Sequence, residues 1–159
     1  MDCAAPTAAS GNSRRRASLL ALPLILLATT GASTPGADLA IAIDGLRNDK
    51  GAVMLCLTRR TQDQFLQCRS DPARITRVVA SNAARRIEVD GLRPGDYSLL
   101  VIHDENRNGK LDKMMGIPRE GFGFSRNPAI RMGPPKYDQV HFAVPAGHSA
   151  QTIKLRYLL

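Results

Sequence analysis

Tryptophan is absent from this 159-residue chain, and aromatic residues of all kinds make up only 4% of it. A hydrophobic core must therefore be mainly aliphatic. The scarcity of aromatic residues also argues against nucleic acid as a partner, because bases stack on aromatic side chains placed among basic ones. The net charge of +8 is carried largely by scattered arginines. These favour a solvated basic face, and a weak attraction to an anionic envelope surface is the alternative.

Long apolar runs are also lacking. A membrane-spanning helix needs about 20 apolar residues, and the run at residues 19–28 is too short. It follows Arg14, Arg15 and Arg16 and precedes small residues at 29–33, which is the order of a secretory signal peptide. We predict that residues 1–33 are a signal peptide that is removed, rather than a retained anchor. Residues 38–159 would then form a single β-sandwich domain, periplasmic or secreted and without a membrane span.

Removal of the leader changes the charge and the cysteine count. The exported chain would carry 19 basic and 13 acidic residues, a net charge of +6. Cys3 would leave with the leader, so that Cys56 and Cys68 remain, an even number in an oxidising compartment. A structural disulfide between them is the prediction, with two buried free thiols or a redox pair as alternatives. Two cysteines alone make a poor zinc site.

Apolar residues alternate with small or polar residues along much of the chain, which is the period of a β-strand. The alternation is clear at 39–43, 53–57, 87–89, 97–101, 140–144 and 153–157, and less clean at 74–80. Asn48 to Gly51 predicts a hairpin between the first two segments, and Gly91 to Asp96 a tight turn. Residues 62–67 predict one helical turn around Phe65. The pattern predicts an all-β fold, an antiparallel immunoglobulin- or transthyretin-like sandwich of about seven strands.

One segment, Asp104 to Lys136, shows no clean strand pattern. It is dense in glycine and proline, yet it contains apolar residues such as Met114, Ile117 and Phe122. A segment of this length inside a compact domain is usually functional or disordered, and its apolar content argues against disorder. We predict a long structured loop packed over one end or face of the sandwich.

The long loop opens with the pattern of a calcium-binding loop, in which Gly109 at position six allows a sharp turn. Position twelve, where such loops carry a bidentate glutamate, is Met115, so calcium would bind weakly, in the range of about 0.1–1 mM. Asx turns, in which Asp and Asn side chains bond their own backbone, are the alternative. The candidate ligands stand at positions one, three, five, seven and nine: Asp104, Asn106, Asn108, the backbone carbonyl of Lys110, and Asp112.

No catalytic site is predicted, but an alternative set of catalytic residues is present. His103 lies at the end of a predicted strand, next to the long loop, where Glu120 and Arg119 can surround it. A histidine suits general acid–base chemistry near neutral pH. A histidine in such a place more often orients a loop by hydrogen bonding to the backbone or to a carboxylate, and this structural role is preferred here.

Several short motifs follow one another along the chain. They are Gly45-Leu46-Arg47-Asn48 with Gly51, Gly91 to Tyr97, His103 to Asp112, Gly116 to Ser125, and Gly133-Pro134-Pro135. In this order they resemble the secreted bacterial family catalogued as domain of unknown function 2141, from about Asp38 to the C-terminus. The resemblance implies an exported β-sandwich and carries no established activity.

Two functions are consistent with these features. The first is an exported, non-catalytic β-sandwich module of the bacterial envelope, with a calcium-type loop, that presents its long Gly/Pro-rich loop to an envelope protein or glycan. The second is a small periplasmic hydrolase or ligand-binding protein with a site at the mouth of the loop. A concave pocket with converging polar side chains would favour the second, and a flat loop surface with a buried, hydrogen-bonded His103 would favour the first.

Overall fold

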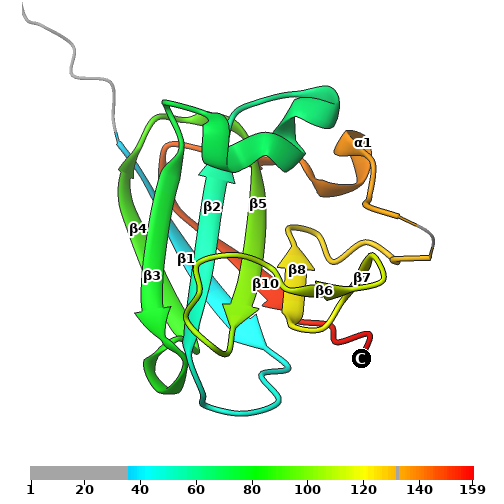
Figure 1. Ribbon diagram of the computed structural model, residues 1–159. Coiled ribbons are helices and arrows are strands. Elements are labelled where there is room, and N and C mark those ends of the chain that lie inside the picture. Colours follow the sequence, from blue (N-terminus) through cyan, green and yellow to red (C-terminus); the bar gives the residue numbers. More distant parts are fainter. Residues whose placement is uncertain (1–35, 132) are drawn as a thin grey trace, which may run out of the picture. The chain divides into compact units, whose positions relative to one another are not determined.

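The computed structural model describes residues 36–131 and 133–159. The predicted signal peptide, residues 1–33, lies outside them. The described residues are mostly β-strand, with short helical segments between some of the strands. Two main sheets form the layers of a sandwich, with β1 and β10 crossing behind β2 and β5 (Figure 1). The prediction of an all-β, sandwich-like fold is confirmed.

The smaller main sheet has the strand order β10-β1-β4. It consists of β1 (Ala37–Asp44), β4 (Arg86–Leu92) and β10 (Gly147–Lys154). β1 pairs with β4 in the antiparallel sense but with β10 in the parallel sense, from Ala37 opposite Gly147 to Asp44 opposite Lys154. The prediction of a wholly antiparallel sandwich is therefore wrong for this pair. Two parallel strands need a long connection between them, and here the connection between β1 and β10 includes almost the whole domain.

The larger sheet has the order β3-β2-β5-β8, with β9 also pairing β5. Its strands are β2 (Ala52–Thr58), β3 (Ile75–Ala80), β5 (Gly95–Asp104), β8 (Gly121–Phe124) and β9 (Phe142–Val144). All of these pairs are antiparallel. β5 is the longest strand, and β8 and β9 pair with successive parts of it, so residues from distant parts of the chain meet along β5.

The core between the two sheets is aliphatic, as the lack of tryptophan predicts. Each buried aliphatic side chain contributes about 1.5–3 kcal/mol relative to exposure. Because side chains alternate along a strand, Leu100 and Ile102 of β5 lie on the opposite, outer face, where they are only half-buried. The inward residues of β1, β2 and β5 include Leu39, Ile41, Ile43, Val53, Leu55, Leu57, Leu99 and Val101.

Three expectations about the connections are wrong. Residues 48–51 form no hairpin, since β1 and β2 belong to different sheets. Residues 104–136 contain strands, among them β8, whose Gly-Phe-Gly-Phe sequence hides the usual pattern. Gly123 of β8 is needed because a Cβ there would lie 2.6 Å from the Ile153 side chain. Val140 ends a helical turn, α1 (Tyr137–Val140), and does not begin a strand.

Helical turns cover one end of the larger sheet. The predicted turn around Phe65 is present as η1 (Gln62–Ser70), and Phe65 is buried. Cys56 on β2 and Cys68 on η1 form a disulfide, with 6.2 Å between their Cα atoms, which confirms the predicted bridge. A second turn, η2 (Ser81–Ala83), follows β3. Every helix within residues 36–131 and 133–159 falls short of the length and apolar content needed to cross a membrane.

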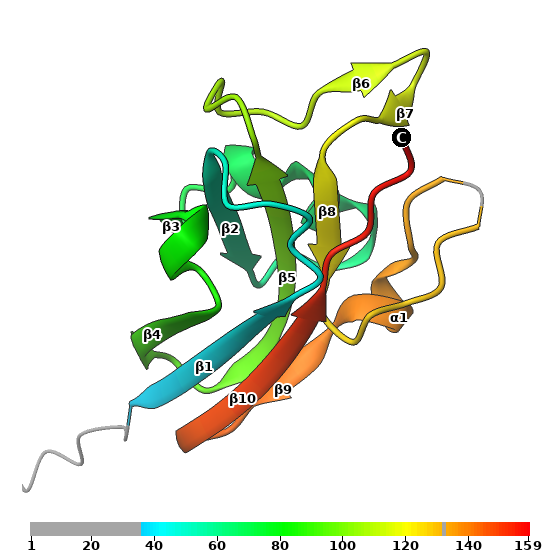
Figure 2. The ribbon, with the colours of Figure 1, turned by 90° about the horizontal axis from the view of Figure 1, so that it is seen from below.

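The long loop carries a small hairpin that stands away from the two main sheets (Figure 2). It consists of β6 (Lys113–Met114) and β7 (Ile117–Pro118), joined at Met115 and Gly116. Figure 2 also shows the chain after β10 running beside β8. Phe122 and Arg156 exchange two backbone hydrogen bonds there, of 3.0 and 2.9 Å, which connect the end of one sheet to the edge of the other.

Candidate functional site

The long loop begins where β5 ends, against the connection between β1 and β2. Gly51 lies so close to this point that a Cβ on it would fall 2.0 Å from the Asp104 carbonyl oxygen. Gly51 also has φ of +70°, which disfavours any other residue. The backbone of the 45–51 connection therefore packs directly on the first residues of the loop and fixes where it starts.

Asp104, the first residue of the calcium-type pattern, is buried and shapes the loop from inside. Its two carboxylate oxygens accept hydrogen bonds from the backbone N–H groups of Asn108, at 3.1 Å, and Gly109, at 2.7 Å. Gly109 has φ of +77°, as position six of such a loop requires. The predicted sharp turn is present, and the Asp104 side chain stabilises it.

The remaining members of the pattern converge on one another. The Asn106 and Asn108 amide nitrogens donate to the two oxygens of Asp112, at 2.7 and 2.8 Å. The Asn106 side-chain oxygen accepts from the backbone N–H of Asn108, and that of Asn108 from the backbone N–H of Lys110, both at 3.0 Å. These bonds from Asn108 and Asn106 lower the pKa of the Asp112 carboxyl. The two bonds from the backbone N–H groups of Asn108 and Lys110 are the Asx turns of the alternative interpretation.

Glu120 holds the two ends of this nine-residue loop together. One carboxylate oxygen accepts from the backbone N–H of Glu105 and the other from that of Asp112, both at 3.0 Å. Glu120 is buried, and the Arg119 backbone N–H adds a bond of 2.9 Å to the Asp112 carbonyl. Glu120 therefore supports the loop from outside the proposed ligand set. Within the described residues no group of three acidic, histidine or cysteine side chains is arranged to hold a metal.

His103 is fully buried, with 0% of its surface exposed. Its Nε2 lies 2.8 Å from the carbonyl oxygen of Lys50 and its Nδ1 lies 2.7 Å from the hydroxyl of Tyr157. The carbonyl can only accept, so Nε2 donates to it, and in the neutral ring Nδ1 accepts from the tyrosine. Both ring nitrogens are thus engaged with groups that hold β5 against the 45–51 connection and the C-terminal segment.

Arg47 connects four parts of the chain. Its Nε and Nη2 donate to the two carboxylate oxygens of Glu105, at 2.9 and 2.5 Å. Nη1 donates to the Leu159 carbonyl at 2.8 Å, and Nη2 also donates to the Arg119 carbonyl at 3.0 Å. The guanidinium lies 4.5 Å from the centre of the Tyr157 ring. This two-point pairing with Arg47 lowers the pKa of Glu105 to about 2, and the Glu105 carboxylate in turn raises the pKa of Arg47.

A polar cavity of about 410 Å³ opens beside these groups. Glu105, Glu120 and Arg119 line it together with Asn106 and Asp112. His103 is not among its lining residues, so the structure separates the histidine from the other two members of the alternative catalytic set. Ser125 offers no nucleophile either, because it is buried and its hydroxyl donates to the Val140 carbonyl.

Sequence reasoning missed the roles of Arg47, Asn48, Glu105 and Tyr157. Arg47 and Asn48 occur within one of the motifs that carry the family resemblance, and Asn48 donates from its side chain to Glu105. Their pairing with the loop spans 58 and 57 positions of sequence, so no local spacing points to it. Tyr157 ends the last clear alternation, residues 153–157, and its position there indicates an ordinary core residue.

A second, larger hollow of about 730 Å³ lies on the outer face of the larger sheet, bounded by the β6–β7 hairpin and by Ile130, Arg131, Gly133 and Pro134. Its floor is formed by the half-buried side chains of Leu100, Ile102 and Phe124. We call it the outer groove. Its volume is within the range of about 300–1,000 Å³ that is usual for sites of small ligands.

These features define an all-β domain of two packed sheets that carries one long, internally bonded loop with a polar cavity and an apolar groove beside it. Residues 41–154 match the family model described as "Uncharacterized protein conserved in bacteria (DUF2141)". The chain belongs to this family, which confirms the resemblance drawn from its motifs. No curated protein and no solved structure matches the chain. The finer likeness to immunoglobulin or transthyretin folds stays a prediction.

Proposed function

We propose that this protein is an exported, non-catalytic module of the bacterial envelope that binds a partner, an envelope protein or glycan, through its long loop. In this proposal residues 1–33 are removed and residues 38–159 act as a single domain. The observation that carries it is the state of His103, the histidine of the alternative catalytic set. It is fully buried, and both ring nitrogens are engaged in hydrogen bonds. A histidine bonded in this way at both ring nitrogens supports a structural role.

The bonding of the loop also supports a binding role. Glu120, Arg47 and Asp104 together fix the start, the turn and the end of the 104–120 region. A loop held in one conformation loses little conformational entropy when it binds, which favours affinity. The exposed residues of the β6–β7 hairpin are carried on this rigid base.

The polar cavity is a concave pocket with converging polar side chains, which by itself favours the alternative, a hydrolase or small-ligand site. Its carboxylates are poorly suited to proton transfer. Glu105 has a pKa of about 2 because of its pairing with Arg47, so it stays ionised at neutral pH and is a weak base. Glu120 already accepts two backbone N–H groups. The non-catalytic proposal is therefore preferred.

Calcium binding by the loop is part of the proposal. The candidate ligands already converge, since Asn106 and Asn108 both contact Asp112. The same contacts place amide N–H groups, rather than oxygens, against the Asp112 carboxylate. A calcium ion would require both amides to turn, at the expense of these bonds. Only two carboxylates stand at ligand positions, and both considerations support a weak site that shapes the loop.

Export is tested by expressing the full chain with a C-terminal tag in a bacterial host and fractionating the cells. We expect a shortened chain in the periplasm or medium. Replacing Leu26 and Leu27 by arginine in the predicted apolar region should leave an uncleaved chain inside the cell. An uncut wild-type chain in the cytoplasm would refute export.

Binding is tested by retaining envelope components on the immobilised protein. We expect the wild type and the control Val78→Glu, which changes an exposed residue of β3, to retain the same component, and Ile117→Glu on the hairpin to lose it. Both positions are exposed, Val78 by 68% and Ile117 by 44%, so both variants should fold. If instead the wild type converts components of the extract and Arg119→Ala abolishes this turnover, the catalytic alternative is correct.

A further inference from the structure

Three of the seven large apolar side chains that are exposed in the described residues line the outer groove. They are Leu66, Ile117 and Leu158. Met114 and Met115 lie on the hairpin that bounds the groove, and Leu159 follows Leu158. Val78, on β3, is also exposed and belongs to a different strand from those that form the groove. Exposed apolar side chains scattered singly need no explanation, but a cluster around a groove marks a binding surface.

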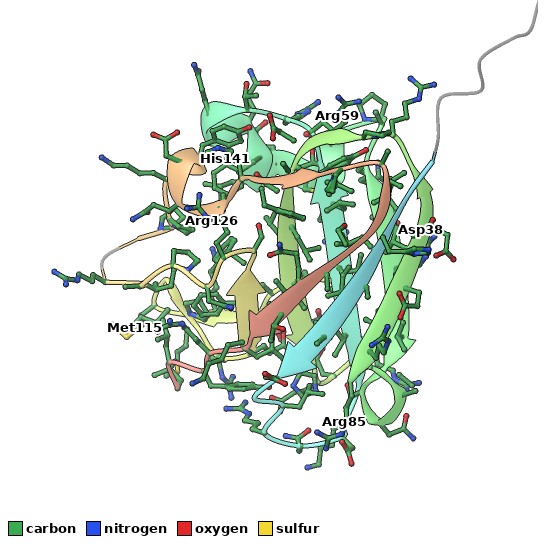
Figure 3. The ribbon with its side chains drawn as sticks, turned by 180° about the vertical axis from the view of Figure 1, so that it is seen from behind. Asp38, Arg59, Arg85, Met115, Arg126 and His141 are labelled. Carbon is green, nitrogen blue, oxygen red and sulfur yellow. A yellow bond between two sulfur atoms is a disulfide. The ribbon has the colours of Figure 1, made fainter. Side chains whose placement is uncertain are left out.

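The tip of the hairpin adds a second, independent observation. Met115 and Gly116 both have positive φ, 51° and 82°, as a two-residue type I′ turn requires. Asn, Asp or Gly suits the first of these positions, and an ordinary side chain there strains the backbone. Met115 is also 96% exposed, and it points outward at the edge of the domain (Figure 3). Neither the turn nor the core benefits from methionine here.

The charges at the groove have one sign. Lys113, from the hairpin, and Arg131, from the loop that follows β8, line the groove, and no acidic residue does. A purely apolar ligand would gain nothing from two cations at the rim. An anionic head group would pair with them while an apolar chain lies along Leu100, Ile102 and Phe124.

We propose that the outer groove binds a monomeric amphiphile with one acyl chain and an anionic head, such as a fatty acid. This inference goes beyond the proposed function, whose partner is an envelope protein or glycan, and adds a small ligand at a separate groove. The chain occupies the apolar floor, and the head group lies between Lys113 and Arg131. Ile117 covers the chain from the hairpin side, and Met115, which points outward in the free protein, turns inward to join it. Methionine suits this task because its side chain is flexible and polarisable.

The test is a fluorescence titration with cis-parinaric acid, a fatty acid that becomes emissive in an apolar site, below its aggregation concentration. The chain contains no tryptophan, so tryptophan fluorescence cannot overlap with the signal of the probe. Hexadecanoate should displace the probe, and hexadecanol, of the same chain length without the charge, should do so at least fivefold less well.

Two pairs of variants separate the groove from the rest of the surface. Ile117→Glu should weaken probe binding at least tenfold, and its control Val78→Glu, with the same change of charge, should stay within twofold of the wild type. Lys113→Glu should weaken it at least fivefold, and its control Arg77→Glu, on β3, should not. If Ile117→Glu lowers the melting temperature, Ile117→Gln takes its place.

Several results would overturn the inference. The first is that the probe does not bind, and the second is that groove and control variants lose probe affinity equally. The third is that the protein binds anionic vesicles but not the monomeric probe. The fourth is that the protein forms a dimer that Ile117→Glu dissociates, without any binding of the probe. The last two would assign the hairpin to a membrane surface or to a second copy of the chain. Retention of an envelope component by the hairpin without fatty-acid binding would refute this inference and leave the proposed function standing.

Discussion

Arg47 binds Glu105 through two parallel hydrogen bonds, although 58 positions separate the two residues. The pair joins the connection between β1 and β2 to the first turn of the long loop. The same guanidinium reaches the carbonyl groups of Arg119 and Leu159. One side chain thus holds the start of the loop, the hairpin base and the C-terminal residue in fixed relation.

Replacement of Arg47 by lysine should destabilise the domain by about 1–2 kcal/mol, because an ammonium group cannot form the two-point contact with Glu105 and also reach both carbonyls. Urea denaturation measures the change. Arg86→Lys is the matched control, since Arg86 pairs with Glu88 on an exposed surface, and it should change stability by less than about 0.5 kcal/mol. Equal effects of the two variants would show that Arg47 makes only a surface ion pair.

The Arg47–Glu105 pair predicts a particular dependence of stability on pH. The pKa of Glu105 is lowered from 4.5 to about 2 in the folded chain. The pair therefore stabilises the fold above the unfolded pKa, and this contribution is lost as the pH falls from 4.5 towards 2. At pH 6 we expect the free energy of unfolding of the wild type to be larger than that of Glu105→Gln by about 1–2 kcal/mol, because solvent screening weakens the ion pair. The two should converge near pH 2.

Glu105→Gln also isolates this effect from other carboxyls. The pKa of Asp71 is lowered as well, by a hydrogen bond from Thr58, and it contributes equally to both proteins. A difference between wild type and variant that stays constant from pH 6 to pH 2 would contradict the assignment to Glu105.

Removal of the disulfide by Cys56→Ser with Cys68→Ser should lower stability by about 3 kcal/mol, because the bridge closes a short loop with a sequence separation of 12. Guanidinium denaturation measures it. A reducing agent should destabilise the wild type by a similar amount and leave the double variant unchanged. If the double variant matches the oxidised wild type, η1 is held by the packing of Phe65 alone.

Calcium should raise the melting temperature by about 2–5 °C at ten times its dissociation constant, through preferential binding to the folded state. Differential scanning fluorimetry in millimolar calcium, compared with chelator, measures the shift. Asp112→Asn keeps the acceptor for one amide but removes one of two carboxylates, so the shift should largely disappear. Superimposable curves for the wild type in calcium and in chelator would leave the Asx turns as the whole explanation of the loop.

Local contacts are the part of the site that sequence reasoning predicted well. The turn at Gly109, the Asp104 contacts with Asn108 and Gly109, and the helical turn around Phe65 all join residues within five positions of one another. Short spacing and residue type decide such contacts. Most strand segments were predictable for the same reason, but β6, β7 and β8 were not. In β8, glycine replaces alternate side chains because Tyr157 and Ile153 pack against the backbone.

Alternation, composition and short spacing were enough to predict the β-strand content, the aliphatic core and the turn that begins at Asp104, because they act within a few positions. The cysteine count favoured the disulfide. The tertiary structure decided that β1 and β10 are parallel, that His103 is buried against Tyr157 and Lys50, and that Arg47 reaches Glu105. It also decided that Lys113, Arg131 and the outer face of β5 line one groove. These relations depend on which sheet edges and faces meet, and that choice is made by the packing of the whole core.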